Sequence, residues 1–436
     1  MPSIVERREE IDLPGTQGRE VNHHGRAIAM TVFSPVRPWY RRAPPPAKVY
    51  HRGVPWLRLV FTGGRAIRSP TITNLSFIHF ARWIVIRRLP DYGQPHDRLQ
   101  QPLLMFESNY NGSFDQYIDG FAHILTEGMT LIWGTSHGFP GPTPVAPFKK
   151  YIEANQFTAN HYYSAYPEAT TTMIKAALAV EELLPSLTER AAAVDSETFA
   201  ADYRRLLTRL QDEPRPAEKE KRSLGQTIGA FLREVGADGS RSGRSYAITL
   251  LTPIRPGAEE ELTACIEGLE TGTRSPLAML PSVHFGRWVV IDQLKSSWSG
   301  APANMTRLKS QYLLFSACVT APVGNEMEPA KFLEWFLNEI WEAKVSEEAN
   351  RPAEDIWGHC LGYPAAADAQ AFVDYLARSR INTSLFHVGY PDVTVAEVRH
   401  ALDTRDKFFA FALKHQGEDS AVLQEVYVRE SAQWFH

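Results

Sequence analysis

A histidine, an arginine and a tryptophan occur at the same spacing at two places in the chain, 205 residues apart. The side chains are His79, Arg82 and Trp83 at the first place, and His284, Arg287 and Trp288 at the second. Histidine can transfer protons near neutral pH, and arginine can stabilise developing negative charge. We therefore predict the histidines and arginines as catalytic residues and the tryptophans as walls of a cofactor site. The alternative is structural, with a buried arginine paired to a carboxylate and a histidine packed under a tryptophan.

These residues belong to a repeated eleven-residue stretch, from His79 to Leu89 and from His284 to Leu294. Seven of the eleven positions are identical. The run is rich in β-branched and aromatic residues and has the length of a strand, so we predict a strand in both places. Successive side chains of a strand point to opposite faces. The pattern therefore predicts histidine and tryptophan on one face and arginine on the other.

The similarity between the two halves extends well beyond these strands. Residues 25–38 match residues 243–256, and residues 148–178 align without a gap to residues 372–402. Each half predicts the order β-α-β-β-α-β, which is that of a ferredoxin-like module, followed by an α-β-α extension. We predict a flexible N-terminal arm over 1–24, a first module over 25–180, a charged helical connector over 181–242 and a second module over 243–436.

Composition narrows the class of protein. The net charge of −4 offers no basic surface for nucleic acid. The three cysteines, Cys265, Cys318 and Cys360, are widely spaced, which favours a reducing compartment over a disulfide framework. No CxxC or HExxH pattern predicts a metal site. The charged N-terminus and the lack of a long apolar run predict a cytoplasmic chain without a membrane span.

The order and duplication of these elements resemble the dimeric α/β-barrel superfamily. Its members include dye-decolorising peroxidases, chlorite-dismutase-like haem proteins and cofactor-free monooxygenases of polyketide pathways. The resemblance implies an α+β fold in which two tandem ferredoxin-like modules pack sheet to sheet as a single-chain, pseudo-dimeric α/β barrel. It covers most of the chain and rests on element order, so it leaves the function open.

The resemblance also implies roles in haem binding. The repeated strand, followed in the first half by the run from Leu103 to Phe106, is similar to the segment that carries the distal arginine of dye-decolorising peroxidases. In the second half, this resemblance implies that Arg287 is the distal arginine. The Gly-x-x-Asp-Gly motif of that family is absent, and no histidine lies between Gly257 and Val283. The remaining candidates for the axial ligand are His400, His387 and His359. Among these three, His400 is the one whose aligned position in the first half is an alanine.

A second pattern is typical of hydrolases. A Gly-x-Ser-x-Gly run centred on Ser136 has a Gly-x-Cys-x-Gly counterpart centred on Cys360. A nucleophile elbow requires a helix directly after the turn, whereas Phe139 and Pro140 follow here. We therefore interpret these glycines as turn residues with positive φ. A run from Asn109 to Gly112 similarly predicts a turn after the third strand of the first half.

Our leading hypothesis is a small-molecule oxidoreductase, peroxidase-like and haem-dependent if it binds a cofactor, with a pocket at the interface between the two sheets. Its ligand would be an apolar or aromatic small molecule, in keeping with an aromatic content of 11%. One alternative is a cofactor-independent enzyme acting on an aromatic or lipid-like substrate. Another is a non-enzymatic binding or assembly module. A homo-oligomer is compatible with each.

Overall fold

The computed structural model of the 436-residue chain describes residues 22–37, 40–42, 48–50, 53–67, 75–211, 223–322, 324, 327–343, 351–365 and 368–434. The predicted N-terminal arm therefore lies outside the described residues, except for its last three positions. Of these, His23 and His24 form strand β1, which pairs with the start of β2.

The first sheet has six antiparallel strands in the order β1-β2-β6-β5-β13, with β7 paired to β2. Their bounds are His23–His24 for β1, Ala27–Pro35 for β2, Leu103–Asn111 for β6, Ile78–Ile86 for β5, Leu385–Val388 for β13 and Gln156–Phe157 for β7. The third predicted strand of this half is longer than expected. Asn109 and Asn111 still belong to β6, so the turn predicted over Asn109 to Gly112 starts later than expected, and the chain turns at the last residue of that run, Gly112, where φ is +90°.

The second sheet has five strands in the order β8-β11-β12-β10-β9. Their bounds are His161–Ser164 for β8, Val283–Ile291 for β11, Tyr312–Thr320 for β12, Ser245–Pro253 for β10 and Arg241–Ser242 for β9. The central three strands repeat the pairing of β5, β6 and β2. A further short hairpin joins β3 (Tyr40–Arg42) to β4 (Lys48–Tyr50).

The two halves exchange their last strands. Strand β8 comes from the first half but pairs with β11 of the second, where Tyr162 lies opposite Arg287. Strand β13 comes from the second half and pairs with β5 of the first, where Phe386 lies opposite Arg82. Each exchanged strand covers the edge of the other half's sheet, an edge that would otherwise expose unpaired backbone groups.

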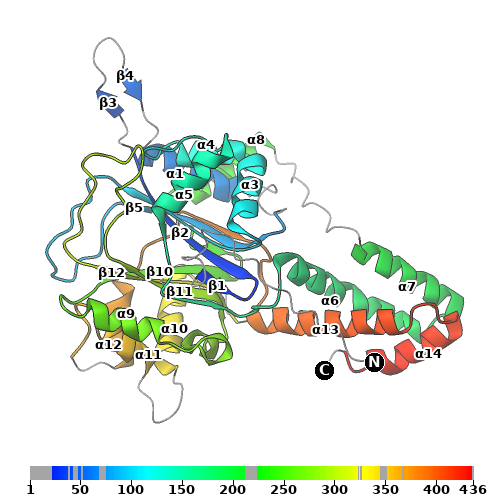
Figure 1. The fold of residues 1–436 in the computed structure, drawn as a ribbon. Coiled ribbons are helices and arrows are strands. Elements are labelled where there is room, and N and C mark those ends of the chain that lie inside the picture. Colours follow the sequence, from blue (N-terminus) through cyan, green and yellow to red (C-terminus); the bar gives the residue numbers. More distant parts are fainter. Residues whose placement is uncertain are drawn as a thin grey trace, which may run out of the picture.

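Helices cover the outer faces of the two sheets, which gives four layers (Figure 1). The first sheet carries α1 (Val54–Ile67), α3 (Phe114–Ile124), α4 (Thr126–Trp133), α5 (Val145–Asn155) and, packed on α1, α8 (Leu224–Glu234). The second carries α9 (Glu259–Glu267), α10 (Pro329–Glu342), α11 (Pro352–Trp357) and α12 (Ala369–Ala377), with short 3-10 turns at Gly272–Arg274 and Pro276–Met279. Helix α3 is typical: Ser113 and Gln116 form a capping box, and its apolar residues face the sheet at helical spacing.

A helical arm projects from one end of the layers (Figure 1). It contains α6 (Thr171–Ala191), α7 (Ser196–Gln211), α13 (Val395–Lys414) and α14 (Ser420–Ser431). Helices α6 and α13 follow the exchanged strands and begin at equivalent threonine caps, Thr170 and Thr394. The arm has a core of its own, which includes Leu187, Phe199 and Tyr427.

The prediction of a mixed α+β fold is confirmed, and the strand pairs of both sheets are antiparallel. Neither sheet of the described chain closes into a barrel, since the strand order of each has two ends. Among the described helices, none is both long enough and apolar enough to cross a membrane.

Candidate functional site

Each repeated strand contains a β-bulge at its histidine. The register between β5 and β6 shifts between Ile78 and Phe80, which leaves His79 as the extra residue, and the same shift occurs in β11 at His284. The predicted alternation is therefore wrong at this point. The ring of His79 lies 4.9 Å from that of Phe285 in the other sheet, between the sheets rather than on the face of Trp83.

The two tryptophans lie on the opposite, helix-covered faces. Trp83 packs 5.0 Å from Phe106, between ring centroids, and belongs to the apolar cluster under the helices of the first sheet. Trp288 packs 5.3 Å from Phe315 and 6.2 Å from Trp357 in the equivalent position. The predicted separation of tryptophan and arginine onto opposite faces is therefore confirmed, whereas each histidine lies on the side of the arginine and not on that of the tryptophan.

Arg82 lies between the sheets, 3% exposed, and binds both of them. Its Nε donates a hydrogen bond of 2.5 Å to Glu107 on the neighbouring strand, with which it forms a buried ion pair. Its Nη1 donates to the carbonyl oxygens of Ile248 and Ala317 on the opposite sheet, at 2.8 and 3.3 Å. Such charge-assisted bonds from a planar guanidinium fix the relative position of the two sheets.

Arg287 makes the corresponding hydrogen bonds from the second sheet to the first. Its Nη1 donates to the carbonyl oxygen of Met30 at 2.8 Å, and its Nη2 to that of Ser108 at 3.2 Å. These two residues occupy the positions equivalent to those that Arg82 binds. Arg287 also donates to Thr31 and Asn109, and it lies over the ring of Tyr162. The two arginines thus form a symmetrical cross-link between the sheets.

The two histidines pair with tyrosines that come from the other half of the chain. Nδ1 of His79 lies 2.9 Å from the hydroxyl of Tyr390, which follows β13. His284 makes the equivalent bond to Tyr166, which follows β8, and its Nε2 lies 2.7 Å from the hydroxyl of Thr320. Strand exchange brings these partners together, because each tyrosine is carried with the exchanged strand.

Burial determines the charge of these histidines. It lowers the pKa of His79 and that of His284 to about 3, so both are neutral at pH 7. A general acid or base works best with a pKa near the operating pH. Burial also raises the pKa of Tyr166 and of Tyr390 well above the usual value. The pairs therefore favour a packing role over proton transfer.

The three candidate axial ligands lie on separate elements. His400 is on α13, with its side chain 39% exposed and its Nε2 3.7 Å from Glu181. His359 follows α11 and lies 3.8 Å from Glu261. His387 is on β13, where burial lowers its pKa to about 3. The described residues hold no group of three or more histidine, cysteine or acidic side chains that could bind a metal. Haem binding stays a prediction.

The Gly-x-Ser-x-Gly pattern and its counterpart each form a turn, and the central residue of each turn makes one isolated backbone bridge to a neighbouring segment. Ser136 pairs with Val36, and Cys360 pairs with Ile254. Both side chains are buried, and burial raises the pKa of Cys360 to about 12. The prediction of turn glycines with positive φ is confirmed for the second glycine of each pattern. The φ angle is +64° at Gly138 and +77° at Gly362. The first glycine of each has helical dihedrals.

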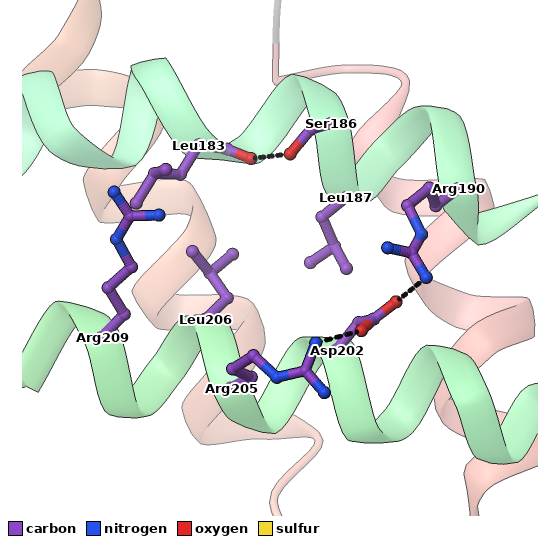
Figure 2. A pocket seen from close by; sticks show the side chains of 8 residues that line it. All are labelled: Leu183, Ser186, Leu187, Arg190, Asp202, Arg205, Leu206 and Arg209. Atoms are coloured by element: carbon purple, nitrogen blue, oxygen red, sulfur yellow. Dashed lines mark hydrogen bonds and ion pairs between the residues drawn. The ribbon is translucent and has the colours of Figure 1, made fainter.

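Space for a ligand is seen outside the network between the sheets. A narrow apolar crevice of about 20 Å³ borders Trp288 and Trp357, a volume that holds about one water molecule. A larger cavity of about 160 Å³ lies in the arm between α6 and α7 (Figure 2). Sequence reasoning missed this site because it assigned residues 181–242 to a connector. The available signal was an apolar stripe bordered by arginines at helical spacing, such as Arg205 and Arg209 beside Leu206.

Sequence reasoning also missed the partners of the four predicted catalytic residues. Glu107 could have been suspected, because it is a single carboxylate within the apolar run that forms β6. Tyr166 and Tyr390 occupy aligned positions in the two halves, which is a further signal. When the sequence was compared with known protein families and with curated proteins, neither comparison gave a match.

Proposed function

We propose that this chain is a non-enzymatic binding module, in which the two sheets form a rigid platform and the helical arm carries the recognition surface. One observation supports this most strongly. Arg82 and Arg287 each donate two hydrogen bonds to main-chain carbonyls of the opposite sheet. Donors that already hold the fold together are unavailable to a substrate.

The burial of the network points in the same direction. His79 and His284 are fully buried and Arg287 is 1% exposed, so a substrate would have to displace protein contacts to reach any of them. An oxidoreductase or a cofactor-independent enzyme would need open space beside these groups. A cavity of about 160 Å³ lies instead in the arm.

We further infer that each sheet descends from a ferredoxin-like module. In the first sheet the strands of one half follow the order β7-β2-β6-β5, which is the 4-1-3-2 order of a βαββαβ unit. In the second sheet an isolated bridge between Leu250 and Arg380 replaces the short fourth strand. Two such modules that exchange their last strands would form a pseudo-dimer, which explains why the arginine and histidine contacts occur twice.

A selection experiment tests the binding function. The full-length chain is immobilised and used to select from a library of random peptides displayed on phage, and the selected sequences are then synthesised and titrated in solution by fluorescence anisotropy. We expect a shared sequence pattern among the selected peptides and saturable binding. A library that yields no common pattern and no saturable binder would contradict the proposal.

A further inference from the structure

The cavity in the arm has an apolar floor. Leu183 and Leu187 reach into it from α6, and Leu206 reaches into it from α7 (Figure 2). Leu187 and Leu206 are largely buried in the core of the arm, whereas the cavity above them is open to solvent. A partner can therefore reach this floor without any rearrangement of the sheets.

Charged side chains surround that floor. Asp202 lies between two arginines, with Arg190 Nη2 at 2.6 Å from its Oδ2 and Arg205 Nη1 at 2.9 Å from its Oδ1 (Figure 2). Arg209 borders the other end of the cavity, beside Leu183. The lining thus holds three arginines and one carboxylate.

The arginines of this rim face solvent. The side chains of Arg190 and Arg205 are 54% and 75% exposed, so part of each guanidinium is free to bind a second anion. Two acidic residues, Glu182 and Glu189, are exposed on α6 but do not line the cavity. The rim itself is therefore positive, and it complements an acidic partner.

The volume of the cavity limits what can enter it. A cavity of about 150 Å³ holds a molecule the size of benzene, whereas sites for drug-sized ligands span about 300–1,000 Å³. The observed 160 Å³ therefore suits one apolar side chain and is too small for a whole cofactor. A single apolar anchor surrounded by polar contacts is the usual organisation of a protein interaction site.

We propose that this arm pocket, formed by the eight residues of Figure 2, binds an acidic peptide segment of a partner protein. One leucine-sized or phenylalanine-sized side chain of the segment enters the cavity, and flanking carboxylates pair with Arg205 and Arg209. The inference rests on the proposed binding function and specifies the site and chemistry of the partner.

The test uses the peptides selected on the full-length chain and a double charge-reversal variant, Arg205→Glu with Arg209→Glu. We expect acidic residues around one apolar residue in the selected peptides, and affinity at least about tenfold weaker for the variant, since two attractive pairs become repulsive. A matched control is Arg204→Glu, which changes the charge on an exposed position of α7 that does not line the cavity. The control should retain binding, and thermal unfolding should confirm that all variants fold.

A second variant separates the apolar contact from the charges. Leu183→Asn introduces an uncharged polar side chain at a partly exposed position of the cavity, and it should also reduce affinity about tenfold without any change in charge. Raising the salt concentration should weaken binding, because contacts between exposed charges are screened.

Three outcomes would contradict the proposal that the arm pocket binds an acidic peptide. Peptides that bind the double variant as tightly as the native chain would place the site elsewhere, while the binding function would stand. Selected peptides without acidic enrichment would exclude the proposed partner chemistry. The third outcome is that the native chain sediments with phosphatidylserine vesicles, the double variant does not, and no peptide binds measurably. That result would identify a membrane surface as the partner instead of a peptide.

Discussion

Ser316 donates a hydrogen bond of 3.0 Å to Glu107, the residue at the equivalent position in the other half of the chain. Each lies opposite the arginine of its neighbouring strand, Arg82 for Glu107 and Arg287 for Ser316. The two sheets therefore meet at these residues with nearly symmetrical contacts and unequal charges. Arg82 has a buried carboxylate partner, whereas Arg287 is held by neutral oxygen atoms.

This difference predicts unequal effects of removing the two arginines. Arg82→Met should lower the free energy of unfolding by about 3–5 kcal/mol, because it leaves Glu107 buried without a cation. Arg287→Met should cost less, because it removes a charge and leaves only neutral acceptors. Urea denaturation measures both. Arg88→Met, at an exposed position after the same strand, is the control and should change stability by no more than about 0.5 kcal/mol. Equal losses for both arginines would contradict the assigned role of Glu107.

The buried histidines predict a loss of stability in acid. The pKa of His284 and that of His387 are about 3 in the folded chain, whereas an unfolded histidine has a pKa near about 6.5. Between these values the unfolded state binds more protons, so stability falls as the pH drops below about 6.5 and continues to fall towards about 3. Each histidine contributes a slope of at most about 1.4 kcal/mol per pH unit.

Urea denaturation between pH 4 and 7 tests this slope. In His284→Gln the side chain no longer titrates, so the variant should show a shallower dependence of unfolding free energy on pH than the native chain, whatever its absolute stability. Adding His387→Gln should flatten the dependence further. An unchanged slope in both variants would show that neither histidine is buried in its neutral form.

Strand exchange predicts that neither half is stable alone. When the chain is split between Gln211 and Ser223 and the fragments are expressed separately, β5 and β11 should each lack an edge partner. Exposed strand edges promote aggregation, so we expect insoluble fragments from separate expression and a soluble complex from co-expression. Analytical size exclusion and circular dichroism provide the measurement. A soluble, folded first fragment on its own would argue against the exchange.

Haem binding can be tested by reconstitution. The predicted axial ligands lie apart and the predicted distal arginine is buried in protein contacts, so we expect no stoichiometric Soret band after haem is added to the purified chain. A band that persists after gel filtration and disappears in His387→Ala would instead support the haem-dependent oxidoreductase. His400→Ala, at the more exposed candidate, serves as the comparison.

Local patterns in the sequence were sufficient to predict the repeated strands and the duplication of the chain. The duplication and the strands that contain Arg82 and Arg287 follow from side-chain type and periodicity over short stretches. These features need no knowledge of distant residues, because hydrophobic spacing and caps act within a few turns or one strand.

The functional interpretation depended on contacts that only the folded chain creates. The bulge that moves His79 between the sheets cannot be read from a regular alternation of side chains. The partners of Arg82 lie up to 235 residues away in the chain, and those of His79 lie 311 residues away.

The sequence by itself therefore determined which residue types recur and on which elements they lie. The tertiary structure decided which distant groups those residues contact, and it placed a cavity bordered by arginines in a segment that looked like a connector. The physical reason is that packing of one half against the other, with exchange of β8 and β13, satisfies the polar groups of the repeated strands.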